Sequence, residues 1–184
     1  AGSTGTLVPP KGYLQKLREI CDKHGILLIF DEVITGWGRT GSKFGAHEFG
    51  VTPDIMTMAK ATTNGVVPMG VVACNDSIYD AVMDASPKGA VELFHGYTYS
   101  GIPVAVAAAL AVQVIFEKDD FFNRAKNLAP YFQKGLFSLQ DLESVYNIRG
   151  YGMMGGIDMK LNTKPGKAGY ETFKACYEAG VNFK

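Results

Sequence analysis

Two charged side chains stand directly after apolar runs that have the composition of β-strands. Asp31 follows the run ILLIF, and Lys60 ends the run IMTMAK. In an open α/β sheet, ligands bind beyond the carboxyl ends of the strands, so a carboxylate and an amine at these positions could face one site. Spacing alone favours the plainer interpretation, an ion pair at the strand ends, because such pairs are common on protein surfaces.

A second interpretation gives the same pair a chemical role. An enzyme that uses pyridoxal phosphate needs a lysine whose amine forms a Schiff base with the cofactor aldehyde. It also needs an acid that keeps the pyridine nitrogen protonated, so that the ring can act as an electron sink. Lys60 and Asp31 carry the right groups for these roles, and other residues must decide between the two interpretations.

The glycines that follow Asp31 offer a competing site. Residues 36–41 read GWGRTG, which has the G-x-G-x-x-G spacing of a dinucleotide-binding turn. In such a turn the first glycine follows the strand directly and the third opens a helix. Here the segment DEVIT separates the strand from Gly36, and residues 42–45 do not begin an amphipathic helix. The sequence therefore favours a tight irregular loop over a nucleotide site.

Helices and strands alternate in the first part of the chain. Apolar residues three and four apart predict a helix at 13–24 that ends at Gly25. The continuously apolar run ILLIF predicts a strand covered on both faces, and a helix that feeds such a strand implies a parallel layer. Further elements are expected as strands at IMTMA and VVAC, a short helix at NDSIYDAVMDA capped by Asn75 or Asp76, and a buried helix at 103–116.

The sequence pattern predicts a domain boundary near residue 118. Beyond it, an apolar stripe from Phe122 to Leu139 predicts another helix, which Pro130 is expected to kink. Short strands around 146–148 and 153–159 and a helix through 170–176 follow. These patterns predict an α/β domain at 1–118 and a small α+β domain at 119–184.

Composition limits the classes of partner. The chain of 184 residues has 18 basic and 18 acidic residues, so nothing indicates binding to nucleic acid or to an acidic membrane surface. Its three scattered cysteines and three histidines lack metal-ligand or disulfide spacing, which predicts no metal site and a reducing compartment, most simply the cytoplasm. No signal-peptide pattern is present, and the longest apolar run is too short to span a bilayer.

Three blocks of the sequence resemble the class III pyridoxal-phosphate-dependent aminotransferases, also called ω-aminotransferases. The blocks are ILLIFDEVITGWGRTG, FGVTPDIMTMAKATTNGVVPMG and FHGYTYSGIPVAVAAALA, in the order and at the spacing of that family. Within the family, VITGWGRTG, TNGVVPMG and VELFHGYTYSG most resemble the β-alanine–pyruvate and related enzymes. The resemblance covers essentially the whole chain and reverses the preference for a simple ion pair. It implies a partial fold-type-I transferase, with the latter part of the large mixed-sheet α/β domain at 1–118 and the beginning of the small domain at 119–184.

The resemblance assigns roles to five positions. Asp31 would pair with the pyridinium nitrogen of pyridoxal 5'-phosphate, and Val33 would pack against one face of its ring. Lys60 would form the Schiff base and then carry a proton between the substrate carbon and the cofactor carbon. Thr98 would bind the cofactor phosphate of the neighbouring subunit of a homodimer, and Arg149 would bind a substrate carboxylate.

Some of these roles have plainer alternatives. Val33 could be simple core, Thr98 could satisfy a loop backbone through its hydroxyl, and Arg149 could be a structural cation at a strand end. Ala61 and Ile102 stand where the family commonly has a glycine and a histidine. These two departures leave substrate preference open more than the type of reaction.

The implied reaction is transfer of an amino group from an ω-amino acid or amine such as β-alanine to pyruvate. One alternative is an ornithine-type or diamine transaminase, or an aminomutase, of the same family. Another is a catalytically inactive fragment that serves only as a structural or interaction piece. Family members carry an N-terminal half that cups the phosphate and stacks on the ring, and they continue beyond Lys184. We therefore expect this chain to be a fragment with marginal stability on its own.

Overall fold

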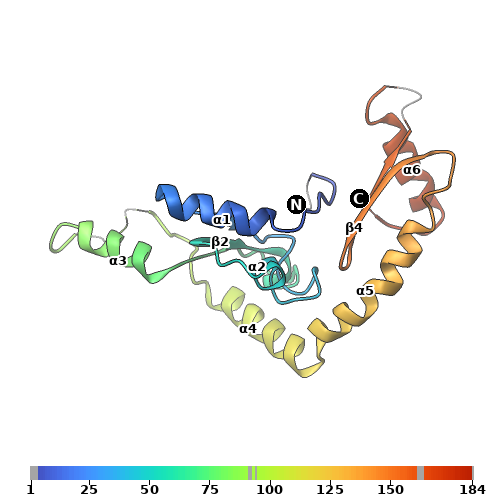
Figure 1. Cartoon of the computed structure of the whole chain (residues 1–184). Coiled ribbons are helices and arrows are strands. Elements are labelled where there is room, and N and C mark those ends of the chain that lie inside the picture. The colour runs from blue at the N-terminus through green and yellow to red at the C-terminus, as the bar shows by residue number, and fades with distance from the viewer. Residues whose placement is uncertain (1–3, 91–92, 94, 161–163, 184) are drawn as a thin grey trace. The chain divides into compact units, whose positions relative to one another are not determined.

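The computed structural model describes residues 4–90, 93, 95–160 and 164–183 (Figure 1). The chain forms two compact units. The first, here called the sheet unit, is Pro9–Asn127, and the second, the hairpin unit, combines Ala1–Val8 with Leu128–Lys184. Within the described residues, no helix has the length and apolar character needed to cross a membrane.

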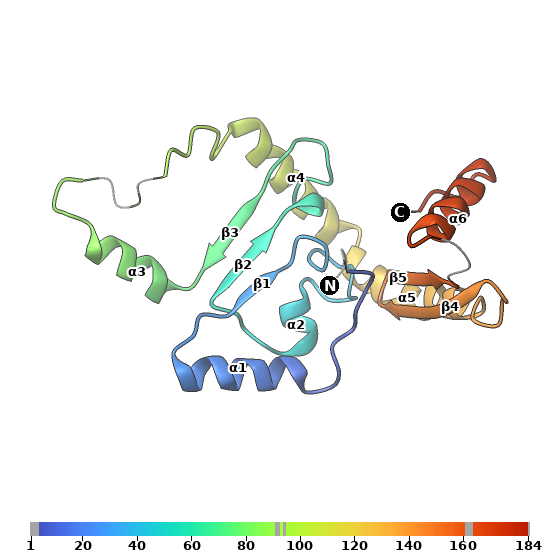
Figure 2. The ribbon, with the colours of Figure 1, turned by 90° about the horizontal axis from the view of Figure 1, so that it is seen from above.

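The sheet unit is built on a three-stranded mixed sheet with the order β1-β2-β3 (Figure 2). Its strands are β1 (Ile29–Asp31), β2 (Ile55–Met58) and β3 (Val71–Cys74). β1 pairs with β2 in parallel, with Asp31 opposite Thr57, and β3 pairs with β2 in the antiparallel direction. The predicted strands and the predicted parallel layer are thus confirmed, and so is the mixed α/β sheet.

Helix α1 (Tyr13–His24) packs its apolar face against β1. Cys21, Leu28 and Val51 form a buried cluster, with Leu14, Leu17 and Phe30 packed around it. The other face of β1 is not covered by any described residue, and Ile29 is 57% exposed. The prediction of a strand covered on both faces is therefore wrong for this chain, because the sheet unit supplies apolar partners to only one of the two faces.

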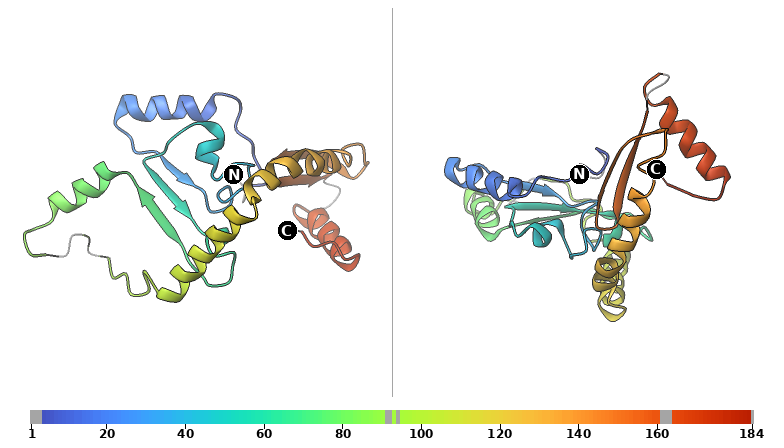
Figure 3. Two further views of the ribbon diagram at one scale, coloured as in Figure 1. Left: turned by 90° about the horizontal axis from the view of Figure 1, so that it is seen from below. Right: turned by 45° about the vertical axis from the view of Figure 1, so that its right-hand side comes forward.

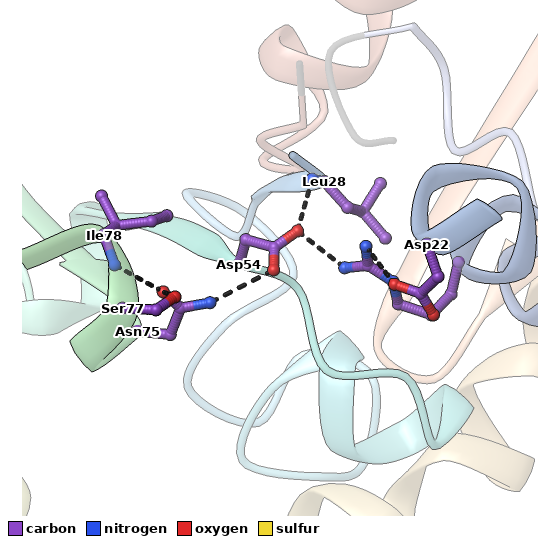
Figure 4. Close-up of polar contacts among 7 residues, drawn as sticks. Asp22, Leu28, Asp54, Asn75, Ser77 and Ile78 are labelled. Atoms are coloured by element: carbon purple, nitrogen blue, oxygen red, sulfur yellow. Dashed lines mark hydrogen bonds and ion pairs between the residues drawn. The ribbon is translucent and has the colours of Figure 1, made fainter. Parts of the chain in front are cut away.

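Asp54, in the turn before β2, accepts hydrogen bonds from three other parts of the sheet unit (Figure 4). Its Oδ2 accepts hydrogen bonds from Nη1 of Arg18 on α1 (2.8 Å) and from the backbone N–H of Leu28 (2.7 Å). Its Oδ1 accepts from the side-chain amide of Asn75 (3.2 Å), the predicted N-cap of α3 (Asp76–Ala85). The Leu28 N–H and the Arg18 guanidinium hold the pKa of the Asp54 carboxyl below its usual value.

We expect Asp54→Asn to lower the free energy of unfolding at neutral pH by about 2 kcal/mol, because it removes charge-assisted hydrogen bonds that link α1, β1 and α3. Since folding lowers the pKa of Asp54, the stabilisation is complete above about pH 4 and is lost as the pH falls through the folded-state pKa. Urea unfolding at neutral pH and at about pH 3 should therefore show a smaller difference between parent and variant in acid. Asp80→Asn, at an exposed position on α3, is the control. An equal difference at both pH values would contradict the prediction.

Helix α4 (Pro103–Lys118) lies against η1 (Lys60–Thr62), the turn that follows β2 (Figure 3). The predicted helix is confirmed, but the prediction that it is buried is wrong. Ala105 and Val112 are buried, whereas most of its other apolar residues are half-buried or exposed. A helix that is apolar on every side needs partners on every side, and the described residues contact only part of it. The short helix α2 (Gly45–Phe49) completes the sheet unit.

The hairpin unit contains the strands β4 (Val145–Tyr151) and β5 (Met154–Met159), which pair in the antiparallel direction, and the helix α6 (Lys167–Glu178). Both strands and the helix had been predicted. Helix α5 (Phe121–Phe137) continues through Pro130, and Gln133 in its second half donates to the carbonyls of Gly152 and Met154 (2.8 and 3.0 Å).

The two units divide inside α5. The first half of α5 packs on the sheet unit: the Gly38 Cα lies so close to the Phe122 ring that a Cβ there would come within 3.2 Å of it. The domain boundary between residues 118 and 119 stays a prediction. Residues at the N-terminus join the hairpin unit because the carbonyl of Gly5 accepts a hydrogen bond from Nε of Arg149 (2.7 Å). Assignment of the units to the large and small domains of a longer protein stays a prediction.

Candidate active site

Asp31 and Lys60 lie at the same edge of the sheet, beyond the carboxyl ends of two neighbouring parallel strands. Asp31 is the last residue of β1 and pairs in register with Thr57 of β2. Lys60 begins η1, two residues past Met58, the last residue of β2. Both side chains are exposed, and no ion pair joins them. The structure therefore brings the predicted acid and amine to one edge without the simple ion pair that spacing alone had favoured.

The free groups at this edge are one carboxylate oxygen and one amine. Oδ1 of Asp31 accepts a hydrogen bond from the backbone N–H of Val33 (3.0 Å), which fixes the carboxylate and leaves Oδ2 without a partner among the described residues. The Lys60 amine likewise forms no hydrogen bond or ion pair within the part of the chain that the structure describes. Val33 is half-buried directly behind Asp31, so a role in packing and a role beside a ligand remain compatible.

Glu32, the second carboxylate of the pair, has the opposite environment. It is 1% exposed, and its oxygens accept from the backbone N–H groups of Gly45 (2.9 Å) and Ala46 (2.7 Å) and from the Thr35 hydroxyl. These bonds cap the N-terminus of α2, which has no cap from its own N-cap residue. A Cβ at Gly45 would come within 3.2 Å of both Glu32 oxygens, so the glycine permits this approach.

The glycine-rich segment is an irregular loop of turns, as the sequence predicted. It leads to α2, whose first turn binds a carboxylate of the chain itself rather than offering free N–H groups to a pyrophosphate. Trp37, at the centre of the loop, packs against Phe44 with ring centroids 4.8 Å apart. Its indole N–H donates to the hydroxyl of Thr62 (3.0 Å), two residues after Lys60.

The predicted phosphate-binding residue, Thr98, lies outside this part of the sheet. Thr98 is exposed in a turn before α4, and its hydroxyl has no partner among the described residues. Val91, Glu92 and Phe94, which precede it in the motif VELFHGYTYSG, lie outside the described residues. The described residues contain no group of three or more His, Cys, Asp or Glu that could hold a metal ion.

Arg149 belongs to the hairpin unit, and its guanidinium is already engaged. Nη2 donates to Oδ1 of Asp158 (2.9 Å), Nη1 donates to the second oxygen of the same carboxylate, and Nε donates to the carbonyl of Gly5. This bidentate pair holds the pKa of Asp158 below its usual value. Of the two roles that the sequence left open, the geometry favours the structural cation, because each of the three guanidinium nitrogens already donates to an internal acceptor.

Comparison with known proteins identifies the family of the chain. A family model for class III aminotransferases matches residues 1–184. The chain belongs to the class III aminotransferase family. An omega-aminotransferase from Caulobacter vibrioides is 52% identical over 184 aligned residues, which cover 98% of this chain and 41% of that protein. A beta-alanine–pyruvate aminotransferase from Pseudomonas aeruginosa is 56% identical over 160 residues, which cover 86% of this chain and 36% of that protein.

Solved structures agree with the family. A transaminase with L-alanine superposes with a TM-score of 0.94 at 35% identity, covering 100% of this chain and 45% of that one. An (S)-enantioselective omega-transaminase from Thermomicrobium roseum has a TM-score of 0.89 at 37% identity and is covered over 42% of its length. The fold is therefore that of part of a fold-type-I transferase, as predicted, and the chain spans less than half the length of these relatives.

Class III aminotransferases depend on pyridoxal phosphate, and the exposed edge of the sheet fits such a cofactor. A free carboxylate oxygen of Asp31 suits a protonated ring nitrogen, and the free amine of Lys60 suits an aldehyde. Sequence reasoning found these two residues but missed the structural role of Glu32, the bond from Trp37 to Thr62 and the pairing of Arg149 with Asp158. Of these three missed features, only the burial of Glu32 had a signal in the sequence. Successive side chains at a strand end point to opposite faces, so one of the two neighbouring acids is expected to point inward.

Proposed function

We propose that this chain forms part of an enzyme that transfers an amino group from an ω-amino acid or amine, such as β-alanine, to pyruvate. The observation that carries the proposal is the free Asp31 oxygen and the free Lys60 amine at one edge of the parallel strand pair. Relatives named as omega- and beta-alanine–pyruvate aminotransferases, with 52% and 56% identity, support the choice of substrates.

In this proposal the residues of the chain bind the cofactor and move protons. Pyridoxal phosphate, when bound, supplies the electron sink that stabilises negative charge on the substrate carbon. Asp31 would hold the proton on the ring nitrogen, and Val33 would pack against the ring. Lys60 would hold the cofactor through its amine, and the same amine would move a proton to and from the substrate carbon.

The proposal extends to assembly and location. Thr98 would bind the cofactor phosphate of a second subunit, which makes a homodimer the active form, in the cytoplasm. The exposed position of its hydroxyl, free among the described residues, is compatible with this role. Light scattering on the whole enzyme measures the assembly, and unchanged cofactor affinity in Thr98→Val would contradict the phosphate contact.

The role of Arg149 as the partner of a substrate carboxylate stays a prediction, and it depends on the release of Asp158. The substrate would have to displace Asp158 from the guanidinium. If it does, Arg149→Lys raises KM for carboxylate substrates more than for amines without a carboxylate, because lysine cannot form the bidentate pair. Equal KM values for the two classes would leave Arg149 as the structural cation.

Two rival functions follow from the same site. A diamine or ornithine-type transaminase, or an aminomutase, would keep the roles of Asp31 and Lys60 and differ in the preferred donor. The putrescine–pyruvate aminotransferase of Pseudomonas aeruginosa, 42% identical over 164 residues, makes diamines a relevant part of a donor panel. The second rival is an inactive piece that serves only as a structural or interaction partner.

The first experiment adds pyridoxal phosphate to the chain, reduces with borohydride and locates the phosphopyridoxyl group by peptide mass spectrometry. We expect the label on Lys60, and its loss from that peptide in Lys60→Ala, because Lys60 is an amine without an internal partner beside a fixed carboxylate. Lys43→Ala, an exposed lysine of the glycine-rich loop, is the matched control and should keep the label. Label spread evenly over many lysines would contradict a cofactor site in this chain.

A further inference from the structure

Two consecutive hydrogen bonds, here called the relay, fix the turn that contains Lys60. They act on residues that lie on either side of the lysine. The indole Nε1–H of Trp37 donates to Oγ1 of Thr62 (3.0 Å), and that hydroxyl donates to the carbonyl of Ala59 (3.0 Å). Ala59 precedes Lys60 and Thr62 follows it by two positions, so the relay brackets the lysine. Thr62 is 3% exposed, and water therefore does not readily replace these bonds.

The backbone of Lys60 is in a conformation that needs such support. Its φ is 48°, in the left-handed region that is unfavourable for residues with a Cβ. A residue stays in this region only where its surroundings over-determine it, and such positions concentrate at functional sites. The relay and the backbone bond from Thr62 N–H to the Ala59 carbonyl (3.0 Å) provide that constraint.

Trp37 is a rigid donor for the relay. Its indole packs between Phe44, with ring centroids at 4.8 Å, and Phe116 of α4, at 6.4 Å. Its backbone N–H donates to the carbonyl of Lys43 (2.6 Å), and its own φ is 63°. The loop that holds Trp37 begins next to Asp31, so the relay connects the turn behind the acid with the turn that carries the amine.

We propose that Trp37 and Thr62 are positioning residues, which hold the Lys60 amine in place relative to Asp31 through the backbone of η1. The use of Lys60 in catalysis rests on the proposed function, whereas the hold on its backbone does not. The alternative is that Trp37 contributes only aromatic packing. Trp37→Phe separates the two, because phenylalanine keeps an aromatic ring between Phe44 and Phe116 but donates no hydrogen bond.

The first test needs no cofactor. Lys60→Gly should melt roughly 3 °C above Lys60→Ala, because glycine adopts the left-handed conformation without strain. In a Trp37→Phe or Thr62→Val background, the turn is free to relax, and we expect this difference to fall by at least half. An undiminished difference in both backgrounds would overturn the proposal, since Lys60 would then be held by something else. If Trp37→Phe fails to fold, the melting difference in the Thr62→Val background decides the test.

The second test measures how selectively the Lys60 amine is labelled. Trp37→Phe and Thr62→Val should lower the share of borohydride-fixed label on Lys60 about five-fold, the equilibrium effect of one lost hydrogen bond. Thr62→Ser keeps the hydroxyl and should restore the share of the parent, while Ser77→Ala removes a hydroxyl on α3 as the control. Parent-like labelling in both Trp37→Phe and Thr62→Val would overturn the positioning role. If the parent itself labels no lysine selectively, the proposed function has failed and the melting comparison alone decides the inference.

Discussion

Asp31→Asn is expected to lower the rate of amino transfer about a thousand-fold in the proposed aminotransferase. The change removes the negative charge that would hold a proton on the ring nitrogen of the cofactor, and that proton is what makes the ring an effective electron sink. The fold should not suffer, because Asp31 is exposed. Within the described residues its carboxylate accepts one hydrogen bond, from the Val33 N–H to Oδ1, and an asparagine oxygen can accept that bond equally well.

The measurement is single-turnover transfer from β-alanine to enzyme-bound cofactor, followed together with a urea unfolding curve. Asp84→Asn, at an exposed position on α3, controls for loss of one surface charge. A variant that transfers at the parental rate would show that the acid beside the ring is another residue. A variant that unfolds much earlier than the parent would mean that Asp31 stabilises the fold, against its exposure in the structure.

The position of the acid and the amine could be predicted because it depends on local patterns. An apolar run defines a strand, the residue after the run lies at its carboxyl end, and two parallel strands bring their ends to one edge. For Asp31 and Lys60 these steps suffice, and the register of β1 against β2 confirms them. The helix at 13–24, the hairpin strands and the cap at Asn75 followed from equally local signals.

The failed and missed predictions depend on side-chain contacts and on coverage, which periodicity does not define. No local pattern pairs Trp37 with Thr62 or Arg149 with Asp158, because side-chain partners are set by the packing of whole elements. The exposure of β1 and α4 could not be predicted either. Periodicity shows which residues seek apolar partners, but not whether the partners lie within the same 184 residues.

Glu32→Gln, the same chemical change one position further on, should have the opposite consequence. We expect it to lower the free energy of unfolding of the sheet unit by about 3 kcal/mol, a large part of the roughly 5–15 kcal/mol of a typical domain. Glutamine keeps the shape but replaces one acceptor oxygen with an amide donor, which would then face the Gly45 or Ala46 N–H. A buried N–H would be left without an acceptor, and the negative charge at the start of α2 would be lost.

Urea unfolding measures the effect, with Glu117→Gln, at an exposed position on α4, as the matched control. Hydrogen exchange should also rise at Gly45 and Ala46, because their N–H groups lose a charged acceptor. A stability unchanged from the parent would contradict the structural role that the burial of Glu32 implies. Because Asp31→Asn should affect transfer and spare the fold, the two neighbouring variants test the division of roles between the carboxylates as a pair. In the proposed function the exposed acid would face the cofactor, whereas the buried acid fixes the loop between β1 and α2.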